Sequence, residues 1–154
     1  MPSESSRSSE QQSARLASGA RSLARKLAMQ ALYRVQLNEC PWQDLIQEFA
    51  TEEGMDRADS EYFRELVQGV HTARAELDAQ LAQWMDRDPS LLDPIEHAVL
   101  LIGTFELKSR IEVPYRVVIN EGVGLAKRFG ATDGHKFVNA VLDRAARALR
   151  PHEQ

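Results

Sequence analysis

The chain has 154 residues and a net charge of −4, with 43% hydrophobic and 27% charged residues, a composition typical of one globular domain with a sizeable core. No apolar run approaches the ~20 residues that cross a bilayer, and the polar, serine-rich start is unlike a secretory signal. The single cysteine, Cys40, excludes an internal disulfide and indicates a reducing compartment, so a cytoplasmic protein is expected.

Helical periodicity runs through most of the chain and never gives way to strand alternation, so an all-α fold is expected. The expected helices span, in order, residues 20–38, 42–51, 60–85, 94–108, 114–129 and 134–149. Residues 1–19 contain seven serines and predict a disordered tail before a single helical domain at 20–151. Short linkers favour a domain made of two packed helical halves that meet near residue 90.

Capping residues mark several of the helix ends. Asp59 or Ser60 is expected to cap the third helix, and Asp93, which precedes a proline, the fourth. Gly130 is expected to close the fifth helix in a left-handed conformation, and Asp133 to cap the last. The free N–H groups at the start of the last helix are candidates to receive a phosphate.

The net charge conceals a segregated distribution of basic and acidic residues. Residues 1–35 carry six basic and two acidic side chains, residues 36–106 carry four and sixteen, and residues 107–154 carry nine and five. Such a chain could fold with one basic and one acidic face, and a local basic patch attracts polyanions whatever the total charge. Surface charges that are segregated only for solubility would give the same distribution. The sequence therefore leaves both interpretations open, a basic face that binds polyanions and a charge pattern that only keeps the protein soluble.

Two helices carry candidate RNA contacts. In the first, Arg25 and Tyr33 are two helical turns apart beside Lys26, which predicts a basic stripe ending in an exposed aromatic, although a solvated face is the usual meaning of such a run. In the last, Phe137 lies about 100° from the centre of the core stripe and follows Lys136. Its ring is either a stacking platform, worth roughly 1–3 kcal/mol per base, or a peripheral core residue.

Enzyme signatures are missing from the sequence. There is no dinucleotide-binding or P-loop glycine pattern, and no strand–turn–helix context that could host one. The four histidines are far apart without helical pairing, which disfavours a metal site. A non-enzyme without catalytic residues, metal or cofactor is therefore expected.

Several segments have a recognisable sequence: 24–33 (ARKLAMQALY), 62–69 (YFRELVQG), 96–100 (EHAVL), 105–107 (FEL), 113–115 (VPY), 119–121 (INE), 125–130 (LAKRFG) and 135–143 (HKFVNAVLD). They resemble the NusB family of bacterial transcription antitermination factors over about residues 20–151. The resemblance implies an all-helical fold of two packed bundles with six to seven helices. It also implies binding of single-stranded boxA RNA together with NusE, a small-subunit ribosomal protein, which suppresses Rho-dependent termination in ribosomal RNA operons. Other Nus factors and RNA polymerase are then engaged indirectly.

The resemblance also implies site residues. The RNA-binding positions map to Arg21, Arg25, Lys26, Asp133, His135, Lys136 and Phe137. The positions that bind NusE map to Tyr33 and Glu96, and an acidic middle segment suits a basic ribosomal protein. Ser22 and Leu23 interrupt the run of arginines that the family shows, so either RNA affinity is lower or Arg7 and Arg15 compensate.

Two other function classes are considered. A helical protein-interaction module, monomeric or homodimeric, with little RNA binding of its own agrees with the interrupted arginines and the acidic segment. A related helical domain also precedes the catalytic domain of some ribosomal RNA cytosine methyltransferases. Those enzymes need an α/β domain with a cofactor-binding glycine loop, which these 154 residues do not contain.

Overall fold

The computed structural model describes the backbone of residues 4–154 and the side chains from Arg7 onward. Within this range it contains seven α-helices, one short 3-10 helix and no strand, which confirms the all-α prediction. The helices are α1 (Glu4–Leu37), α2 (Trp42–Phe49), α3 (Ser60–Thr72), α4 (Arg74–Gln83), η1 (Pro89–Leu91), α5 (Pro94–Ser109), α6 (Tyr115–Phe129) and α7 (Gly134–Leu149). None of them is both long and apolar enough to cross a membrane.

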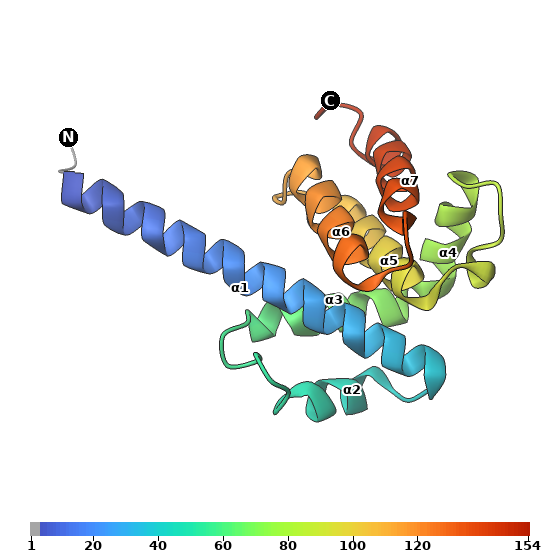
Figure 1. Cartoon of the computed structure of the whole chain (residues 1–154), viewed down its shortest axis with the longest axis horizontal. Coiled ribbons are helices and arrows are strands. Elements are labelled where there is room, and N and C mark those ends of the chain that lie inside the picture. Colours follow the sequence, from blue (N-terminus) through green and yellow to red (C-terminus); the bar gives the residue numbers. More distant parts are fainter. Residues whose placement is uncertain (1–3) are drawn as a thin grey trace.

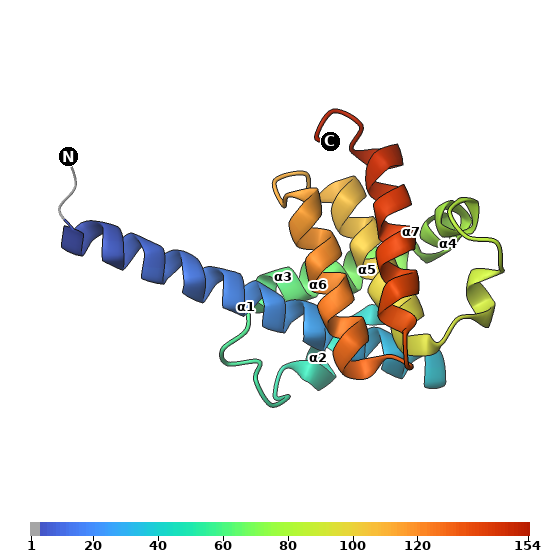
Figure 2. The same cartoon turned by 45° about the horizontal axis from the view of Figure 1, so that its top comes forward.

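Helix α5 lies at the centre of the molecule, where it contacts α1, α3, α4, α6 and α7 (Figures 1 and 2). Its residues are buried almost all the way round, which is the pattern of an internal helix rather than of a surface helix. It thus contacts helices that precede it in the chain (α1, α3 and α4) and both helices that follow it (α6 and α7). One hydrophobic cluster contains side chains from both groups, so the two halves share a core.

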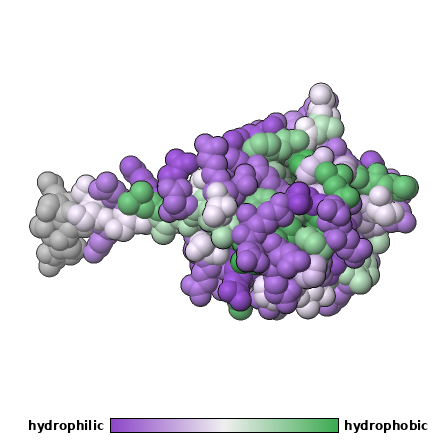
Figure 3. All heavy atoms as spheres, turned by 90° about the horizontal axis from the view of Figure 1, so that it is seen from below, coloured by the Kyte–Doolittle hydropathy of each residue, from purple (hydrophilic) through white to green (hydrophobic). Residues whose placement is uncertain are grey.

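Helix α1 is longer than expected and begins at Glu4. The sequence predicted a disordered tail through residue 19, but from Glu4 this segment is helical, and residues 1–3 lie outside the described part. Every side chain from Arg7 to Gly19 is exposed, and Figure 1 shows this half of α1, called the arm, projecting from the bundle. Figure 3 shows its surface as mainly hydrophilic to neutral. No proline or glycine interrupts residues 4–18, and extending an anchored helix requires no new nucleation.

The expected third helix is two helices. Helix α3 ends at Thr72, and α4 begins at Arg74 after Ala73, which has φ −98° and ψ 14°. The change of direction lets Leu77 and Leu81 of α4 reach the core, where they are 1% and 0% exposed. Tertiary packing therefore decides a break that no glycine or proline marks.

The predicted caps are confirmed at two helix starts and wrong at one helix end. Asp59 and Asp93 accept hydrogen bonds from N–H groups in the first turns of α3 and α5, at 3.0–3.2 Å. Gly130 is not left-handed, because its φ is −85° and its ψ −179°. A close backbone approach explains the glycine instead, since a Cβ there would lie 2.8 Å from the Ala126 carbonyl oxygen.

Asp78 joins α4 to α5. One carboxylate oxygen lies 2.6 Å from Nε2 of His97, and the other accepts from Nε of Arg74 at 3.1 Å. Burial raises the pKa of Asp78, but the hydrogen bonds and charges of His97 and Arg74 outweigh burial, and the net pKa is lowered. A carboxylate with a lowered pKa stabilises the fold above its unfolded-state pKa of about 3.9, and this contribution is lost as the pH falls through the folded-state value.

Asp78→Asn is therefore expected to lower the free energy of unfolding at pH 7 by about 1 kcal/mol, the size of one net hydrogen bond. The difference between the two proteins should shrink at pH 3, where the native carboxylate begins to take up its proton. Urea unfolding at both pH values measures it. An equal difference at pH 7 and pH 3 would contradict an electrostatic role.

Candidate nucleic-acid interface

The loop between α6 and α7, residues 130–133, leads into the predicted RNA-binding turn. Asp133 stands at the N-cap position of α7 with φ 63° and ψ 4°, and its side chain makes no capping hydrogen bond, so the prediction of a side-chain cap is wrong. Its carboxylate instead lies 3.4 Å from Nζ of Lys136, and the two side chains are 68% and 72% exposed. The loop and the first turn of α7 thus present both charges to solvent.

A carboxylate lies on the buried side of the same loop. Glu96 of α5 is only 7% exposed, and its Oε2 accepts from the N–H of Ala131 at 3.4 Å. A Cβ on Gly134 would lie 2.5 Å from Oε1 of Glu96, so only glycine leaves room for this carboxylate at the start of α7. Burial raises the pKa of Glu96. A carboxylate at this helix start competes with a phosphate for the positive helix end, so RNA contacts are expected on the exposed side of the loop.

Phe137 is half-buried, and His135, on the same first turn of α7, is half-buried as well. The ring of Phe137 packs against the edge of the core, and Cζ of Arg87 lies 4.7 Å from its centroid. Arg87 is exposed and belongs to the connection between α4 and η1. Sequence reasoning missed Arg87, because it lies within the acidic middle segment and no local pattern links it to Phe137.

Arg25 is buried, with 3% of its surface exposed, so it does not belong to a basic stripe that RNA can reach, and Tyr33 at the end of the predicted stripe is half-buried rather than exposed. Its Nε and Nη2 donate to the Glu106 carboxylate at 2.9–3.1 Å, and its Nη1 lies 3.5 Å from Oε1 of Glu121. The Tyr62 hydroxyl donates to the same Glu106 carboxylate, and burial together with this charge raises the pKa of Tyr62. Arg25 therefore joins α1 to α5 and α6 and is not free for RNA.

Arg21 and Lys26 lie on different sides of α1. Cζ of Arg21 lies 4.4 Å from the centroid of the Tyr62 ring, and its Nε lies 3.8 Å from Oδ2 of Asp59. Nζ of Lys26 lies 6.0 Å from the centroid of Phe129, the last residue of α6. Among the predicted basic residues of α1, the structure therefore brings Lys26 toward the 130–133 loop and leaves Arg21 beside α3.

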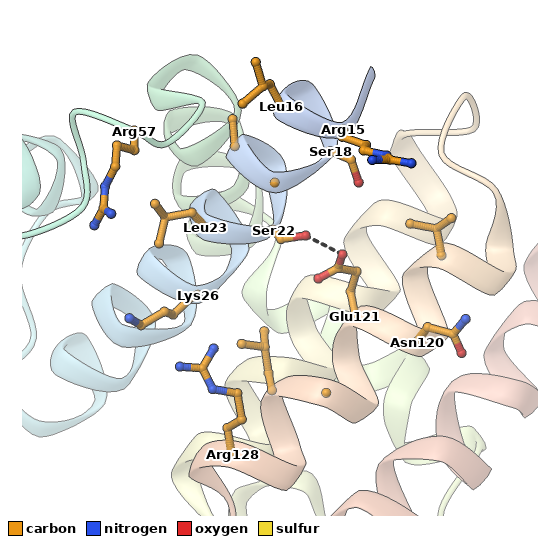
Figure 4. Close-up of a pocket in the computed structure, with 15 residues that line it drawn as sticks. Arg15, Leu16, Ser18, Ser22, Leu23, Lys26, Arg57, Asn120, Glu121 and Arg128 are labelled. Carbon is orange, nitrogen blue, oxygen red and sulfur yellow. Dashed lines mark hydrogen bonds between the residues drawn. The ribbon is translucent and has the colours of Figure 1, made fainter. Parts of the chain in front are cut away.

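A groove of about 960 Å³ lies between α1 and α6 and is called the α1–α6 groove (Figure 4). Small side chains keep it open, and a Cβ on Gly19 or Gly124 would meet no atom within 4 Å. Its lining includes four cations: Arg15 and Lys26 of α1, Arg128 of α6, and Arg57, which lies across α1 from α6 on the connection between α2 and α3 (Figure 4). Within residues 7–154 none of the four forms an ion pair.

The groove has an excess of positive charge. Glu121 is the one carboxylate among its described lining residues, and it accepts a hydrogen bond from Oγ of Ser22 at 2.5 Å, drawn in Figure 4. Arg25 lies 3.5 Å from this carboxylate but is already paired with Glu106, so the described lining carries four cations and one anion. Lys26 and Arg128 meet near one end of the groove, where their cationic groups lie 6.0 and 4.8 Å from the Phe129 centroid. A concave surface with unpaired cations attracts polyanions.

The two residues predicted to bind a protein partner lie on neighbouring stretches of chain. Gln36, one turn after Tyr33, donates to the Pro94 carbonyl oxygen at 3.2 Å, which holds the end of α1 against the start of α5. Tyr33 is half-buried, and Glu96 faces the 130–133 loop rather than solvent. Of the two side chains, Tyr33 therefore offers the larger accessible surface.

Fold and groove together define a class of protein: an all-helical bundle with a cationic groove beside a loop that carries charged side chains and leads to an aromatic one. The sequence matches the NusB family over residues 22–147. The chain belongs to the NusB family.

Curated relatives and solved structures agree with this assignment. The chain is 50% identical to the transcription antitermination protein NusB of Marinobacter nauticus, covering 86% of this chain and 84% of that one. It is 48% identical to the protein of the same name from Pseudoalteromonas atlantica, covering 87% and 96%. The fold is similar to T. maritima NusB, with a TM-score of 0.72, 28% identity and coverage of 80% and 88%. It is also similar to a solved complex of NusB and NusE with dsRNA, with a TM-score of 0.73, 28% identity and coverage of 82% and 96%.

Proposed function

We propose that this protein is a non-enzymatic, cytoplasmic transcription antitermination factor that binds boxA-type single-stranded RNA together with NusE. In this role it suppresses Rho-dependent termination in ribosomal RNA operons and engages other Nus factors and RNA polymerase indirectly. The names of its relatives and the solved complex of a relative with NusE and RNA support the proposal. The observation that carries it is the position of Lys26, which lies beside Phe129 and the 130–133 loop, near the start of α7 where Lys136 is exposed.

The proposed RNA contacts follow from exposure. They comprise Lys26, Asp133, His135, Lys136 and Phe137, with Arg21 at the margin. Arg25 supports this surface from inside, because its guanidinium is held by two carboxylates of α5 and α6. Tyr33 is proposed as a direct contact of NusE, and Glu96 as a buried neighbour of that contact.

Fluorescence anisotropy of a labelled boxA-like RNA tests the proposal, with the protein alone and with NusE, at two salt concentrations. Binding is expected to tighten with NusE and to weaken as salt rises, because phosphate contacts release counterions. A double-stranded RNA of the same sequence serves as a second ligand, since the solved relative was bound to dsRNA. Absence of binding under all these conditions, with the protein folded, would contradict the proposal.

An interaction module with little RNA binding is the second candidate. Leu16 on the arm is 69% exposed and Val117 of α6 is 39% exposed, and both line the α1–α6 groove, so a second copy could cover them. Size-exclusion chromatography with light scattering, followed by RNA titration of each species, separates the two candidates. A dimer that binds no RNA would favour the module.

Lys136→Ala is expected to weaken RNA binding by a similar factor for different RNA sequences and to lower the salt slope by about one unit, because a lysine contacts phosphate rather than a base edge. The matched control is Lys127→Ala, which removes an equally charged, exposed side chain from α6 outside the groove lining. Anisotropy titrations at four salt concentrations give the slopes. Equal slopes for the two variants would remove Lys136 from the interface.

A further inference from the structure

We propose that the α1–α6 groove binds the sugar–phosphate backbone of an RNA segment that continues beyond the segment held at the 130–133 loop. This inference rests on the proposed function and adds Arg15, Arg57 and Arg128 to the RNA-binding surface. None of the three comes from the C-terminal turn or from the interrupted arginine run. The arm forms part of the groove wall and precedes residues 22–147, the part of the chain that matches the family.

The groove is elongated, and its cations are spread along its length. Arg15 and Lys26 are eleven residues apart on α1, a rise of about 16 Å along the helix. On the opposite wall, Val117, Glu121, Gly124 and Arg128 recur at helical spacing along one face of α6. Figure 4 shows Arg15 near one end of the groove and Lys26 with Arg128 near the other. Cations spread along such a length suit a linear polyanion better than a single small anion.

The chemistry of the lining suits a nucleic-acid backbone. Ser18 and Asn120 supply a hydroxyl and an amide that can bond phosphate oxygens and ribose hydroxyls. Leu16, Leu23 and Val117 supply apolar surface against which sugars and bases can pack. The carboxylate of Glu121 is one negative charge against the four cations of the lining, and it accepts a hydrogen bond from Ser22.

A protein occupant fits the groove less well. The partner that the family resemblance implies is a basic ribosomal protein, and unpaired arginines on both walls repel such a surface. RNA complements the same charges. The groove also ends beside Phe129 and the 130–133 loop, so one strand can pass from the loop into the groove without leaving the protein surface.

Two labelled single-stranded RNAs test this inference on the full-length protein. The short RNA carries the boxA-like element alone, and the long RNA carries the same element with unpaired nucleotides added at both ends. For the wild type, the long RNA is expected to bind more tightly and with a steeper salt slope. Arg15→Ala/Arg57→Ala, which removes the two groove cations away from the Lys26 end, is expected to lower the slope of the long RNA by about 1.4 units, at ~0.7 per phosphate contact, and to leave the short RNA unchanged.

The control variant is Arg64→Ala/Arg116→Ala, which removes the same charge from exposed sites outside the groove. It should preserve the advantage of the long RNA, and Arg15→Lys/Arg57→Lys should largely restore that advantage. The long RNA could keep its tighter binding in the groove variant, or lose it equally in the control. Either result would show that the α1–α6 groove does not bind the added nucleotides. If the wild type binds the short RNA and binds the long RNA no more tightly, this inference is wrong but the proposed function stands. If the wild type binds neither RNA, the proposed function fails as well.

Discussion

Arg25→Met is expected to lower the free energy of unfolding by about 3–5 kcal/mol, because it leaves a buried carboxylate without its cation. The side chains of Arg25 and Glu106 are 4% and 2% exposed, and three hydrogen bonds join them. In the variant the carboxylate keeps the Tyr62 hydroxyl as donor but has lost the charge that offsets its desolvation. The substitution removes the link between α1 and both α5 and α6.

Chemical denaturation at pH 7 measures this loss, and Arg34→Met is the matched control. Arg34 also lies on α1 and pairs with Glu48 at 2.9 Å, but the two side chains are 48% and 42% exposed, so its removal should cost under ~1 kcal/mol. Arg25→Met/Glu106→Gln should recover part of the loss, since a neutral amide still accepts from the Tyr62 hydroxyl. A single variant that loses no more than the Arg34 control would show that the buried pair contributes little.

Phe137→Ala is expected to weaken binding of single-stranded RNA roughly 5- to 150-fold, which corresponds to ~1–3 kcal/mol for one stacked base. The ring lies on the first turn of α7, one residue after the exposed Lys136 and close to Arg87. The Arg87 guanidinium lies over the ring, so a base that stacks on that face takes its place, and the displaced cation together with Lys136 can attract the phosphates. Anisotropy with a short boxA-like RNA measures the change.

Phe137→Ala could bind RNA more weakly because the protein is less stable rather than because a base no longer stacks on the ring, so a control variant is needed. Phe105→Ala removes another half-buried ring, which lies against Gly69 at the contact of α3 and α5. Both variants should unfold more easily, but only Phe137→Ala should bind RNA more weakly at a temperature where both remain folded. Equal RNA affinity in the two variants would assign Phe137 to the core edge only.

Local sequence signals predicted the helices well where capping chemistry was present. Asp59 and Asp93 accept hydrogen bonds as a cap requires, and α3 and α5 begin where they indicate. The signals failed where the deciding contact is distant in sequence. Ala73 has no breaking residue beside it, and the turn there exists because α4 packs onto α5. Asp133 was expected to act as a cap, but Glu96 of α5 lies at the start of α7.

The candidate site was predictable at the 130–133 loop and much less so elsewhere. Asp133 and Lys136 are local in sequence, so their shared position needed no knowledge of the fold. Helical spacing could not tell whether the stripe containing Arg25 faces solvent or core, because the deciding partners, Glu106 and Glu121, lie over 80 residues away. Arg57 belongs to an acidic stretch, and only the fold brings it to the α1–α6 groove.

The arm makes one helix span two regimes of stability. Its described side chains from Arg7 to Gly19 are all exposed, so its backbone hydrogen bonds persist only by propagation from the packed half of a 34-residue helix. Amide hydrogen exchange should therefore slow progressively from Arg7 toward Ala24, where the core begins. An RNA strand bound between α1 and α6 would hold the base of the arm. Part of the binding free energy of the RNA would then appear as slower amide hydrogen exchange, which spreads outward along α1.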